Sequence, residues 1–174
     1  MRLSGGTSAG RTVDDHCFVI DSPQALLNCR VVTPFKALTD LKLNGSYPLP
    51  YGLSVSGVFI NLPAPAYTAD YAMPNSAIQP SLGRPLAGGA RNATVPLIAP
   101  MTQFEKRITR LDLRLSKRQQ ITPRLRLQLN LDIYNALNAN TVISSISTYG
   151  SARWLQPNSI LDARLLQFSG NLTF

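Results

Sequence analysis

The sequence predicts an all-β fold, an antiparallel meander of about five or six strands with long loops at one end. Three observations predict this fold. Apolar and polar residues alternate over several segments of about 9 to 11 residues. The connections between these segments are alternately long and short, and the prolines fall between the segments, as a hydrogen-bonded sheet requires. The same features are typical of the wall of a transmembrane β-barrel.

The first part of the chain holds one clear strand. Residues 2–12 are rich in Gly, Ser and Thr and are interpreted as the tail of a strand. Residues 13–36 contain two cysteines and two prolines and are expected to form a long loop. Apolar and polar residues then alternate over 39–47, which predicts a second strand. The Pro- and Gly-rich residues 48–52 predict a short reversal after it.

A third strand is predicted at residues 53–61, although its alternation is blurred towards the end and leaves its facing open. The connection that follows, residues 63–100, is rich in proline and glycine. Connections of this length are usually functional or disordered. We therefore expect a long loop here that does more than join two strands.

The purest pattern lies in the second half of the chain. Residues 108–116 alternate leucine with arginine and aspartate, 117–123 predict a short reversal, and 124–134 place Leu or Ile at every second position. A helix turns by about 100° per residue and would scatter these leucines around its surface. The alternation therefore predicts two strands, despite the helix preference of leucine.

The chain ends in a further strand. Residues 135–159 are expected to form a third long loop, and 165–174 alternate strictly between apolar and polar side chains. Its apolar positions are Leu166, Phe168, Gly170, Leu172 and Phe174. Only a strand places such a set on one face.

The lengths of the connections favour a barrel. Long connections at 13–36, 63–100 and 135–159 alternate with short ones at 48–52 and 117–123. Outer-membrane barrels have short periplasmic turns and long outer loops, and a periplasmic C-terminus puts every long connection outside. A soluble β-sandwich that acts as a binding module also has alternating strands, and this alternative stays open.

Charge and hydropathy narrow the possible classes. The chain of 174 residues has 17 Lys and Arg against 9 Asp and Glu, a net charge of +8. The basic residues sit in strands and beside turns without interleaved aromatic residues, so we do not expect nucleic-acid binding. No apolar run is long enough for a transmembrane helix. The first residues do not form a secretory signal, so either the protein stays inside the cell or the true N-terminus is missing.

The two cysteines leave three interpretations. Cys17 and Cys29 could close a loop by a disulfide in an oxidising compartment, or remain free thiols in a reducing one. A metal site with Asp14, Asp15 and His16 is the third, but adjacent residues rarely converge on one ion and no C-x-x-C pair supports it. The residues favour the disulfide.

No group of residues predicts catalysis. His16 is the single histidine, no serine lies in a G-x-S-x-G motif, and the glycines at 83–89 are not followed by the Lys-Ser or Lys-Thr of a phosphate loop. We expect no enzyme activity and no cofactor.

The polar positions of the two leucine-rich strands are the candidate functional residues. They either line a water-filled lumen or form a structural ladder of cross-strand ion pairs. These residues are Arg110, Asp112, Arg114, Arg124, Arg126, Gln128, Asn130 and Asp132. Any ligand contact is expected in the long loops.

Several segments resemble one family. The run Trp-Leu-Gln-Pro-Asn-Ser-Ile-Leu-Asp-Ala-Arg-Leu at 154–165, followed by a terminal Phe, is similar to the end of TonB-dependent outer-membrane receptors, in particular Oar-like receptors with a carboxypeptidase-regulatory-like domain. Residues 43–50, 61–63, 82–84 and 132–138 also fit this family. The similarity covers nearly the whole chain.

This resemblance implies energised ligand uptake through a plugged barrel in the outer membrane of a Gram-negative bacterium. It also implies partners: the lipid bilayer, the TonB complex, and an outer-membrane assembly machinery that recognises Phe168, Leu172 and Phe174. The chain departs from the family because it shows no signal peptide, no plug domain and fewer than the ~8 strands of the smallest barrels. We therefore expect residues 1–174 to be the C-terminal strands of a receptor barrel, whose plug would reach the TonB complex.

Overall fold

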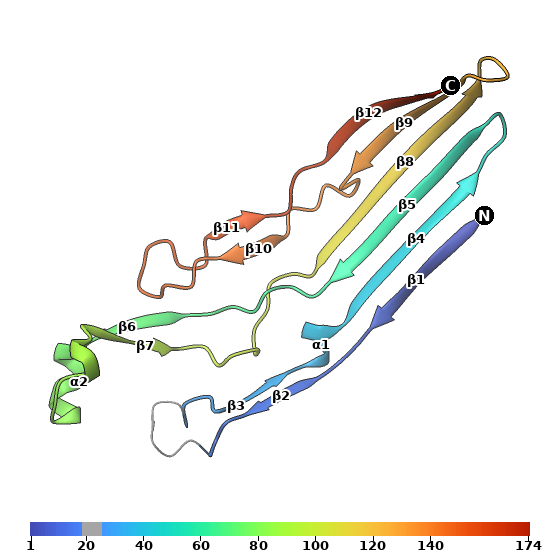
Figure 1. Cartoon of the computed structure of the whole chain (residues 1–174). Helices are drawn as coiled ribbons and strands as arrows, with labels where there is room; N and C mark the ends of the chain where they lie inside the picture. Colours follow the sequence, from blue (N-terminus) through green and yellow to red (C-terminus); the bar gives the residue numbers. More distant parts are fainter. Residues whose placement is uncertain (19–25) are drawn as a thin grey trace.

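The protein is built on a six-stranded antiparallel sheet in the order β1-β4-β5-β8-β9-β12 (Figure 1). A computed structural model describes residues 1–18 and 26–174. Strands that are neighbours in the sheet follow one another along the chain once the inserted segments are set aside, so the sheet is an up-and-down meander. The strands are β1 (Arg2–Ser8), β4 (Asp40–Pro48), β5 (Leu53–Leu62), β8 (Ile108–Gln120), β9 (Arg126–Tyr134) and β12 (Leu165–Thr173). The predicted all-β meander of about five or six strands is confirmed.

Short turns join β4 to β5 and β8 to β9 at one end of the sheet, which we call the short-turn end. In the first turn Gly52 has φ +73°, and a Cβ on it would lie 2.5 Å from the backbone oxygen of Arg118. Both the left-handed conformation and the close approach require glycine. The Arg118 amide in turn donates to the Gly52 oxygen at 2.8 Å, which ties this turn to β8.

The connections at the opposite end, which we call the long-loop end, each contain a small two-stranded sheet (Figure 1). The extra elements are β2 (Thr12–Asp15), β3 (Arg30–Thr33), α1 (Phe35–Leu38), β6 (Asp70–Pro74), α2 (Asn75–Leu82), η2 (Ala87–Gly89), β7 (Asn92–Pro96), β10 (Val142–Ser145) and β11 (Pro157–Ile160). The sequence predicted long connections in these places but did not reveal the elements inside them, and residues 19–25 of the first connection lie outside the described residues. These strands pair within each small sheet, with one isolated bridge from Asp70 of β6 to Thr148, and have no continuous apolar face, so alternation did not reveal them.

Several strand boundaries differ from the prediction. β8 continues to Gln120 because residues 117–120 pair in register with β9, although both faces are polar there. β9 begins at Arg126, so the predicted position of Arg124 in the strand was wrong, and Arg124 lies in the turn. Pro48 is the last residue of β4, where a missing backbone N–H does not interrupt the ladder. Phe174 follows the last residue of β12.

No second layer covers the sheet. The accessible surface of the chain is 12323 Å², whereas a compact monomer of 19.0 kDa exposes about 8,400 Å². Among the described residues, Ala69 is the one buried apolar residue. Within the same residues, no helix has the length and apolar character needed to cross a membrane.

Candidate functional site

The register of the sheet sorts its side chains into two faces. Leu113 lies opposite Ile133, and Leu131 lies opposite Phe168, whereas Arg114 lies opposite Asp132. We call the face that carries Leu113 and Leu131 the apolar face, and the face that carries Arg114 the polar face. The apolar face carries Leu41, Leu43, Val55, Phe59, Leu111, Leu113, Leu115, Leu127, Leu129, Leu131, Ile133, Leu166, Phe168 and Leu172. The polar face carries Arg2, Ser4, Lys42, Asn44, Ser46, Ser54, Ser56, Arg110, Asp112, Arg114, Ser116, Arg118, Arg126, Gln128, Asn130, Asp132, Gln167, Ser169 and Asn171.

The register also settles the facing of β5, which the sequence left open. Val55 and Phe59 share the apolar face with Leu115 and Leu111, their partners in β8. Val58 lies on the polar face, opposite Asp112. The blurred alternation of this strand therefore reflects apolar residues on both of its faces.

An ion pair stands at the centre of the polar face. Arg114 of β8 binds Asp132 of β9 through two parallel contacts, Nε to Oδ1 at 2.5 Å and Nη2 to Oδ2 at 3.0 Å. The Asp132 side chain is 5% exposed, and that of Arg114 is 47% exposed. This bidentate geometry offsets the loss of hydration around the buried carboxylate.

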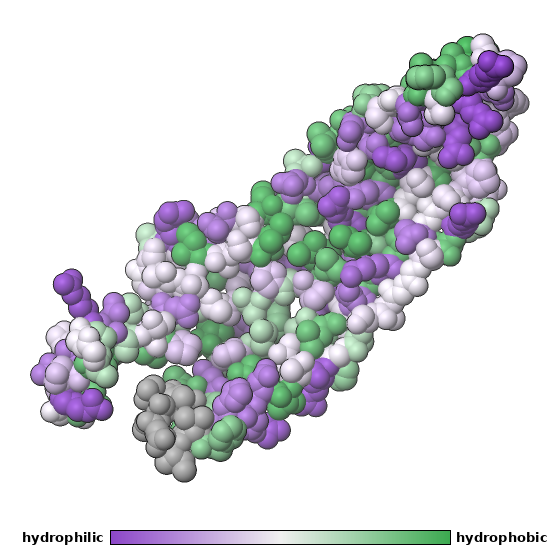
Figure 2. Space-filling view, in the orientation of Figure 1, coloured by the Kyte–Doolittle hydropathy of each residue, from purple (hydrophilic) through white to green (hydrophobic). Residues whose placement is uncertain are grey.

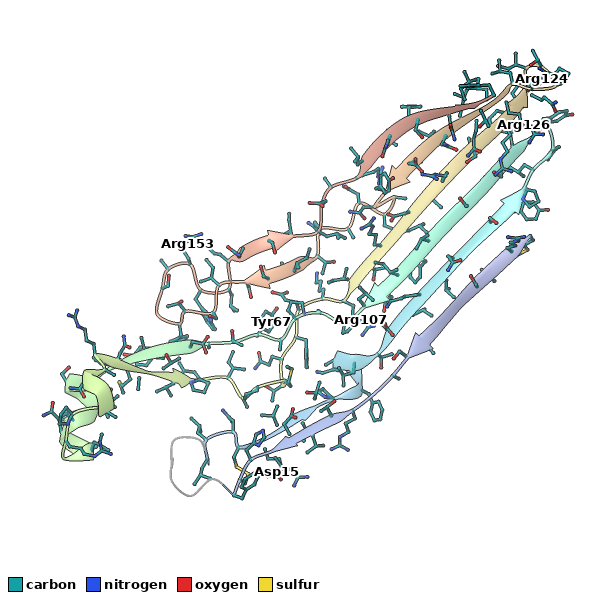
Figure 3. All side chains as sticks on the ribbon, in the orientation of Figure 1. Asp15, Tyr67, Arg107, Arg124, Arg126 and Arg153 are labelled. Atoms are coloured by element: carbon teal, nitrogen blue, oxygen red, sulfur yellow. A yellow bond between two sulfur atoms is a disulfide. The ribbon has the colours of Figure 1, made fainter. Side chains whose placement is uncertain are left out.

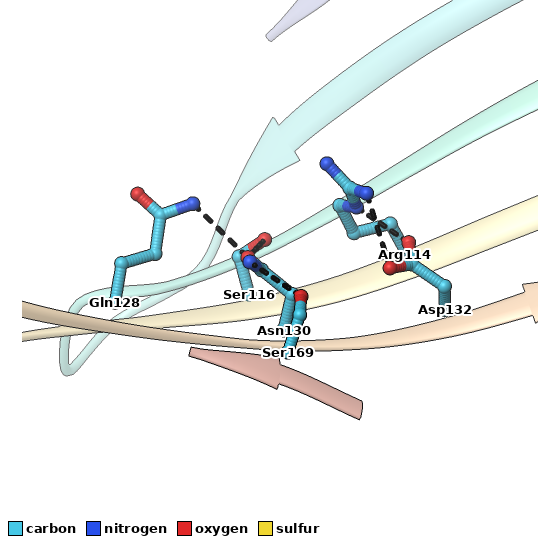
Figure 4. A network of polar contacts seen from close by, with 6 residues as sticks. All are labelled: Arg114, Ser116, Gln128, Asn130, Asp132 and Ser169. Carbon is cyan, nitrogen blue, oxygen red and sulfur yellow. Dashed lines mark hydrogen bonds and ion pairs between the residues drawn. The ribbon is translucent and has the colours of Figure 1, made fainter. Parts of the chain in front are cut away.

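A chain of neutral hydrogen bonds lies beside this ion pair (Figure 4). The hydroxyl of Ser116 and the amide of Gln128 both donate to Asn130 Oδ1, at 2.8 and 3.0 Å. The amide of Asn130 donates to the Ser169 hydroxyl at 3.2 Å. These contacts link β8, β9 and β12, so the polar face is held by side chains as well as by the backbone ladder.

Asp112 does not form the cross-strand ion pair expected from the sequence. Its partner is Arg110 on the same strand, at 2.8 Å from Nε and 2.6 Å from Nη2. Asp112 also accepts a hydrogen bond at 2.8 Å from the backbone N–H of Asn135, which is 3% exposed. The Asn135 amide donates to the oxygens of Ala139 and Asp162. This group therefore holds the start and the end of the β9–β12 connection against the sheet.

Arg107 forms a second anchor at the long-loop end, and the sequence did not reveal it (Figure 3). Its Nε donates to Asn61 Oδ1 at 2.7 Å, and its two terminal nitrogens donate to the backbone oxygens of Lys36 and Thr39 at 3.0 and 2.5 Å. Its partners lie far away along the chain. Asn135 had a detectable signal, because asparagine readily adopts the positive φ of 47° found there, just after a predicted strand.

Seven of the eight candidate polar residues share one face of β8 and β9; the eighth, Arg124, lies in the turn (Figure 3). The polar face is hollowed. One hollow of about 610 Å³ extends from β1 to β9 and is lined by Ser4, Asn44 and Asp132, among others. A second hollow of about 600 Å³ lies nearer the short-turn end.

The cysteines form a disulfide. The sulfur atoms of Cys17 and Cys29 are 1.94 Å apart, just beyond the paired residues of β2 and β3. The backbone N–H of His16 donates to the Cys29 oxygen at 2.8 Å, and Arg30 lies 3.6 Å from Asp15. No group of three or more His, Cys, Asp or Glu in the described part of the chain can hold a metal ion.

Aromatic side chains join two of the long connections. The rings of Tyr71 and Tyr149 lie edge to face at 6.3 Å, and those of Tyr149 and Trp154 at 5.0 Å. The indole N–H of Trp154 donates to the Thr68 oxygen at 3.2 Å. Nearby, burial and a hydrogen bond to the Glu105 carboxylate raise the pKa of the Tyr67 hydroxyl above its usual value.

The three residues of the predicted assembly signal lie at the open edge of the sheet. Phe168 and Leu172 are on the apolar face of β12 and are 79% and 51% exposed, and Phe174 is 96% exposed. Within the described part of the chain, these large apolar side chains are left mostly uncovered.

Comparisons with the models of known protein families, with curated proteins and with solved structures give no significant match. The geometry of the sheet and the sequence motifs therefore carry the functional argument.

Proposed function

We propose that this chain forms part of the wall of a transmembrane β-barrel in the outer membrane of a Gram-negative bacterium. Its apolar face contacts lipid, and its polar face borders a water-filled lumen. The observation that carries the proposal is the uncovered apolar face, on which Leu129, Leu166 and Phe168 are 50%, 57% and 79% exposed. A soluble sheet of this size buries such a face under a second layer.

Strand length supports this orientation. β4, β9 and β12 have 9 residues each, β5 has 10 and β8 has 13. A tilted strand of about 9 to 11 residues crosses the hydrocarbon layer. β8 is longer because its last residues carry polar side chains on both faces, which suits a strand that extends into the interface.

Further strands complete the wall. β1 and β12 each have one neighbour in the sheet, and an open edge cannot satisfy its backbone groups in lipid. Six strands are also fewer than the ~8 of the smallest barrels. The partners of this sheet are therefore the lipid bilayer and the remaining strands of the barrel.

The class of barrel is inferred from the sequence motifs. Their resemblance to TonB-dependent receptors, Oar-like in type, supports a receptor for energised ligand uptake, in which these are C-terminal strands and the TonB complex acts through a plug. The elements at the long-loop end then lie outside the cell, where a disulfide is stable. Phe168, Leu172 and Phe174 are accessible to an assembly machinery that reads the edge strand.

The alternative of a soluble β-sandwich requires a second sheet against Leu113, Leu129 and the rest of the apolar face. In the part of the chain that the structure describes, the three small two-stranded sheets instead lie beyond the long-loop end. No observation favours the sandwich.

Membrane fractionation tests the proposal. The full chain, expressed in a Gram-negative host with an export signal, is expected in the membrane fraction as an assembly of copies whose open edge strands pair with one another. This assembly should resist carbonate extraction and float with lipid in a density gradient. Flotation separates insertion from aggregation, because aggregates stay at the bottom. A variant with Leu113, Leu129 and Leu131 changed to serine is the control and should not float. Recovery of the unchanged chain in the soluble fraction without detergent would refute the barrel.

A further inference from the structure

The charges on the polar face are divided between its two ends. Towards the long-loop end and the middle, three basic residues have acidic partners: Lys42 with Asp40 at 3.0 Å, Arg110 with Asp112 at 2.6 Å, and Arg114 with Asp132. Towards the short-turn end, the polar face has no acidic residue, since β1, β5 and residues 113–131 contain none.

Three arginines in this acid-free half have no ion-pair partner among the described residues. Arg2 lies opposite Ser46, Arg118 opposite Gln128, and Arg126 opposite Gln120 and Thr173. All three are exposed. Arg118 makes one neutral contact, from Nε to Gln128 Oε1 at 3.2 Å. Figure 2 shows strongly hydrophilic residues gathered near this end of the molecule.

Two hollows connect these arginines. One is the hollow of about 600 Å³ near the short-turn end, which is lined by Arg2, Arg114 and Arg118 together with four serines on the polar face. The other, of about 440 Å³, is lined by Arg118, Arg126, Leu127 and neutral Gln, Asn and Thr side chains. Because Arg118 lines both hollows, we treat them as one surface and call it the basic trough, defined by Arg2, Arg118, Arg126 and the lining of the two hollows.

The basic trough is too long for a single small anion to contact all of its arginines. Arg2 lies in the same row as Arg114 but three strands away, a separation of about 14 Å between backbones. Arg118 lies four residues further along β8, about 13 Å from Arg114. A phosphate reaches one or two of these arginines. An extended chain with several carboxylates reaches all of them, and the serine, glutamine and asparagine side chains between them match the hydrogen-bonding groups of a peptide backbone.

We propose that the basic trough binds an acidic polypeptide segment, with bidentate contacts from Arg118 and Arg126 to Asp or Glu carboxylates. This inference rests on the proposed function in one respect: the polar face borders an aqueous lumen, so the partner approaches from inside the barrel. Charge complementarity favours the acidic partner, because it relieves the repulsion among the unpaired guanidinium groups.

A peptide titration tests the basic trough. The purified full chain in neutral detergent micelles is titrated into a fluorescein-labelled ten-residue peptide of alternating Glu and Ser at low salt, and fluorescence anisotropy is recorded. We expect saturable binding that weakens at least tenfold in the Arg118→Gln/Arg126→Gln double variant. The matched control, Arg84→Gln/Arg153→Gln, removes the same charge from exposed positions at the long-loop end and should bind as the unchanged chain does.

A third variant separates binding from folding. Arg118→Lys/Arg126→Lys keeps the charge and loses the bidentate geometry, so it should bind between the unchanged chain and the glutamine variant. Circular dichroism must show the same sheet content in all variants; a glutamine variant that unfolds while the lysine variant binds like the unchanged chain overturns the assignment of bidentate contacts.

Other outcomes overturn the inference. Equal weakening in the two glutamine variants means that only net charge matters. Equal competition by a single-stranded oligonucleotide of the same charge, or by micelles doped with an anionic phospholipid, replaces the polypeptide with a nucleic acid or a lipid. Absence of peptide binding by a chain that floats with lipid refutes the basic trough alone, whereas peptide binding by a chain that does not float refutes the barrel alone.

Discussion

The ion pair between Arg114 and Asp132 is predicted to hold the centre of the sheet together. Changing Arg114 to glutamine leaves the Asp132 carboxylate, whose side chain is 5% exposed, without its bidentate partner. Changing Asp132 to asparagine removes the charge that Arg114 neutralises. In the double variant the two amides can hydrogen-bond to each other, so the loss should be smaller than the sum of the two single losses.

The magnitude follows from the exposure of the two partners. Breaking a fully buried pair costs about 3–5 kcal/mol, and breaking an exposed pair costs about 0–1 kcal/mol. Asp132 belongs to the first class, but Arg114 is 47% exposed and solvent screens it. We expect Arg114→Gln to lower the free energy of unfolding by about 2 kcal/mol and the double-mutant cycle to give a coupling energy of about 1 kcal/mol.

Urea unfolding in phospholipid vesicles, followed by circular dichroism of the sheet, measures these values. The matched control is Arg126→Gln, which removes an arginine of the same face that has no ion pair among the described residues, and should change stability by less than about 0.5 kcal/mol. A coupling energy near zero, or equal losses for Arg114→Gln and Arg126→Gln, would contradict a structural role for the pair.

Three further predictions concern the apolar face, the long-loop end and the disulfide. Leu129→Arg should lower the free energy of unfolding in vesicles by about 2–4 kcal/mol, because a charge at the middle of a lipid-facing strand is poorly solvated. Tyr67 should titrate, by its phenolate absorbance, above the reference pKa of 10.0, and Glu105→Gln should bring it closer to that value. Because the folded pKa is raised, the stability that Tyr67 contributes is complete below pH 10 and is lost as the pH rises through the folded pKa. Mass spectrometry of non-reduced peptides should find Cys17 linked to Cys29 in exported protein.

Each of these predictions has a control. Gln128→Arg places the same charge on the polar face, opposite Arg118, and should cost clearly less than Leu129→Arg because the charge stays hydrated. Equal losses for the Leu129 and Gln128 variants would contradict the facing of β9. Tyr67→Phe removes the absorbance change assigned to this residue; an unchanged midpoint in Glu105→Gln would show that the carboxylate has no influence. Free thiols at positions 17 and 29 in exported protein would refute the disulfide.

The sequence predicted the strands that have one continuous apolar face. β9 and β12 were found within two residues at each end, since alternation is visible wherever Leu or Phe recurs at every second position. The last part of β8 was missed because residues 117–120 are polar on both faces, although they pair in full register. Strand pairing without an apolar face does not produce an alternating sequence pattern.

The small sheets and the anchors could not be predicted from local patterns. β6 and β7 are separated by a helix along the chain, although they pair with each other. The partners of Arg107 lie 46 to 71 residues away along the chain. The alternation of odd and even positions correctly predicted which polar residues of β8 and β9 share a face. It did not predict the partner of Asp112, because Arg110 on the same strand competes with any basic residue on a neighbouring strand.

Lipid quenching measures directly whether the apolar face contacts the hydrocarbon layer. A bimane label is attached to Leu129→Cys or, in a separate variant, to Gln128→Cys, while the native cysteines remain in their disulfide. The full chain is reconstituted in vesicles of brominated phospholipid, which quenches probes in the hydrocarbon layer. Strong quenching is expected at position 129 and little at position 128. Equal quenching at the two positions, or stronger quenching at 128, would contradict the contact of the apolar face with lipid.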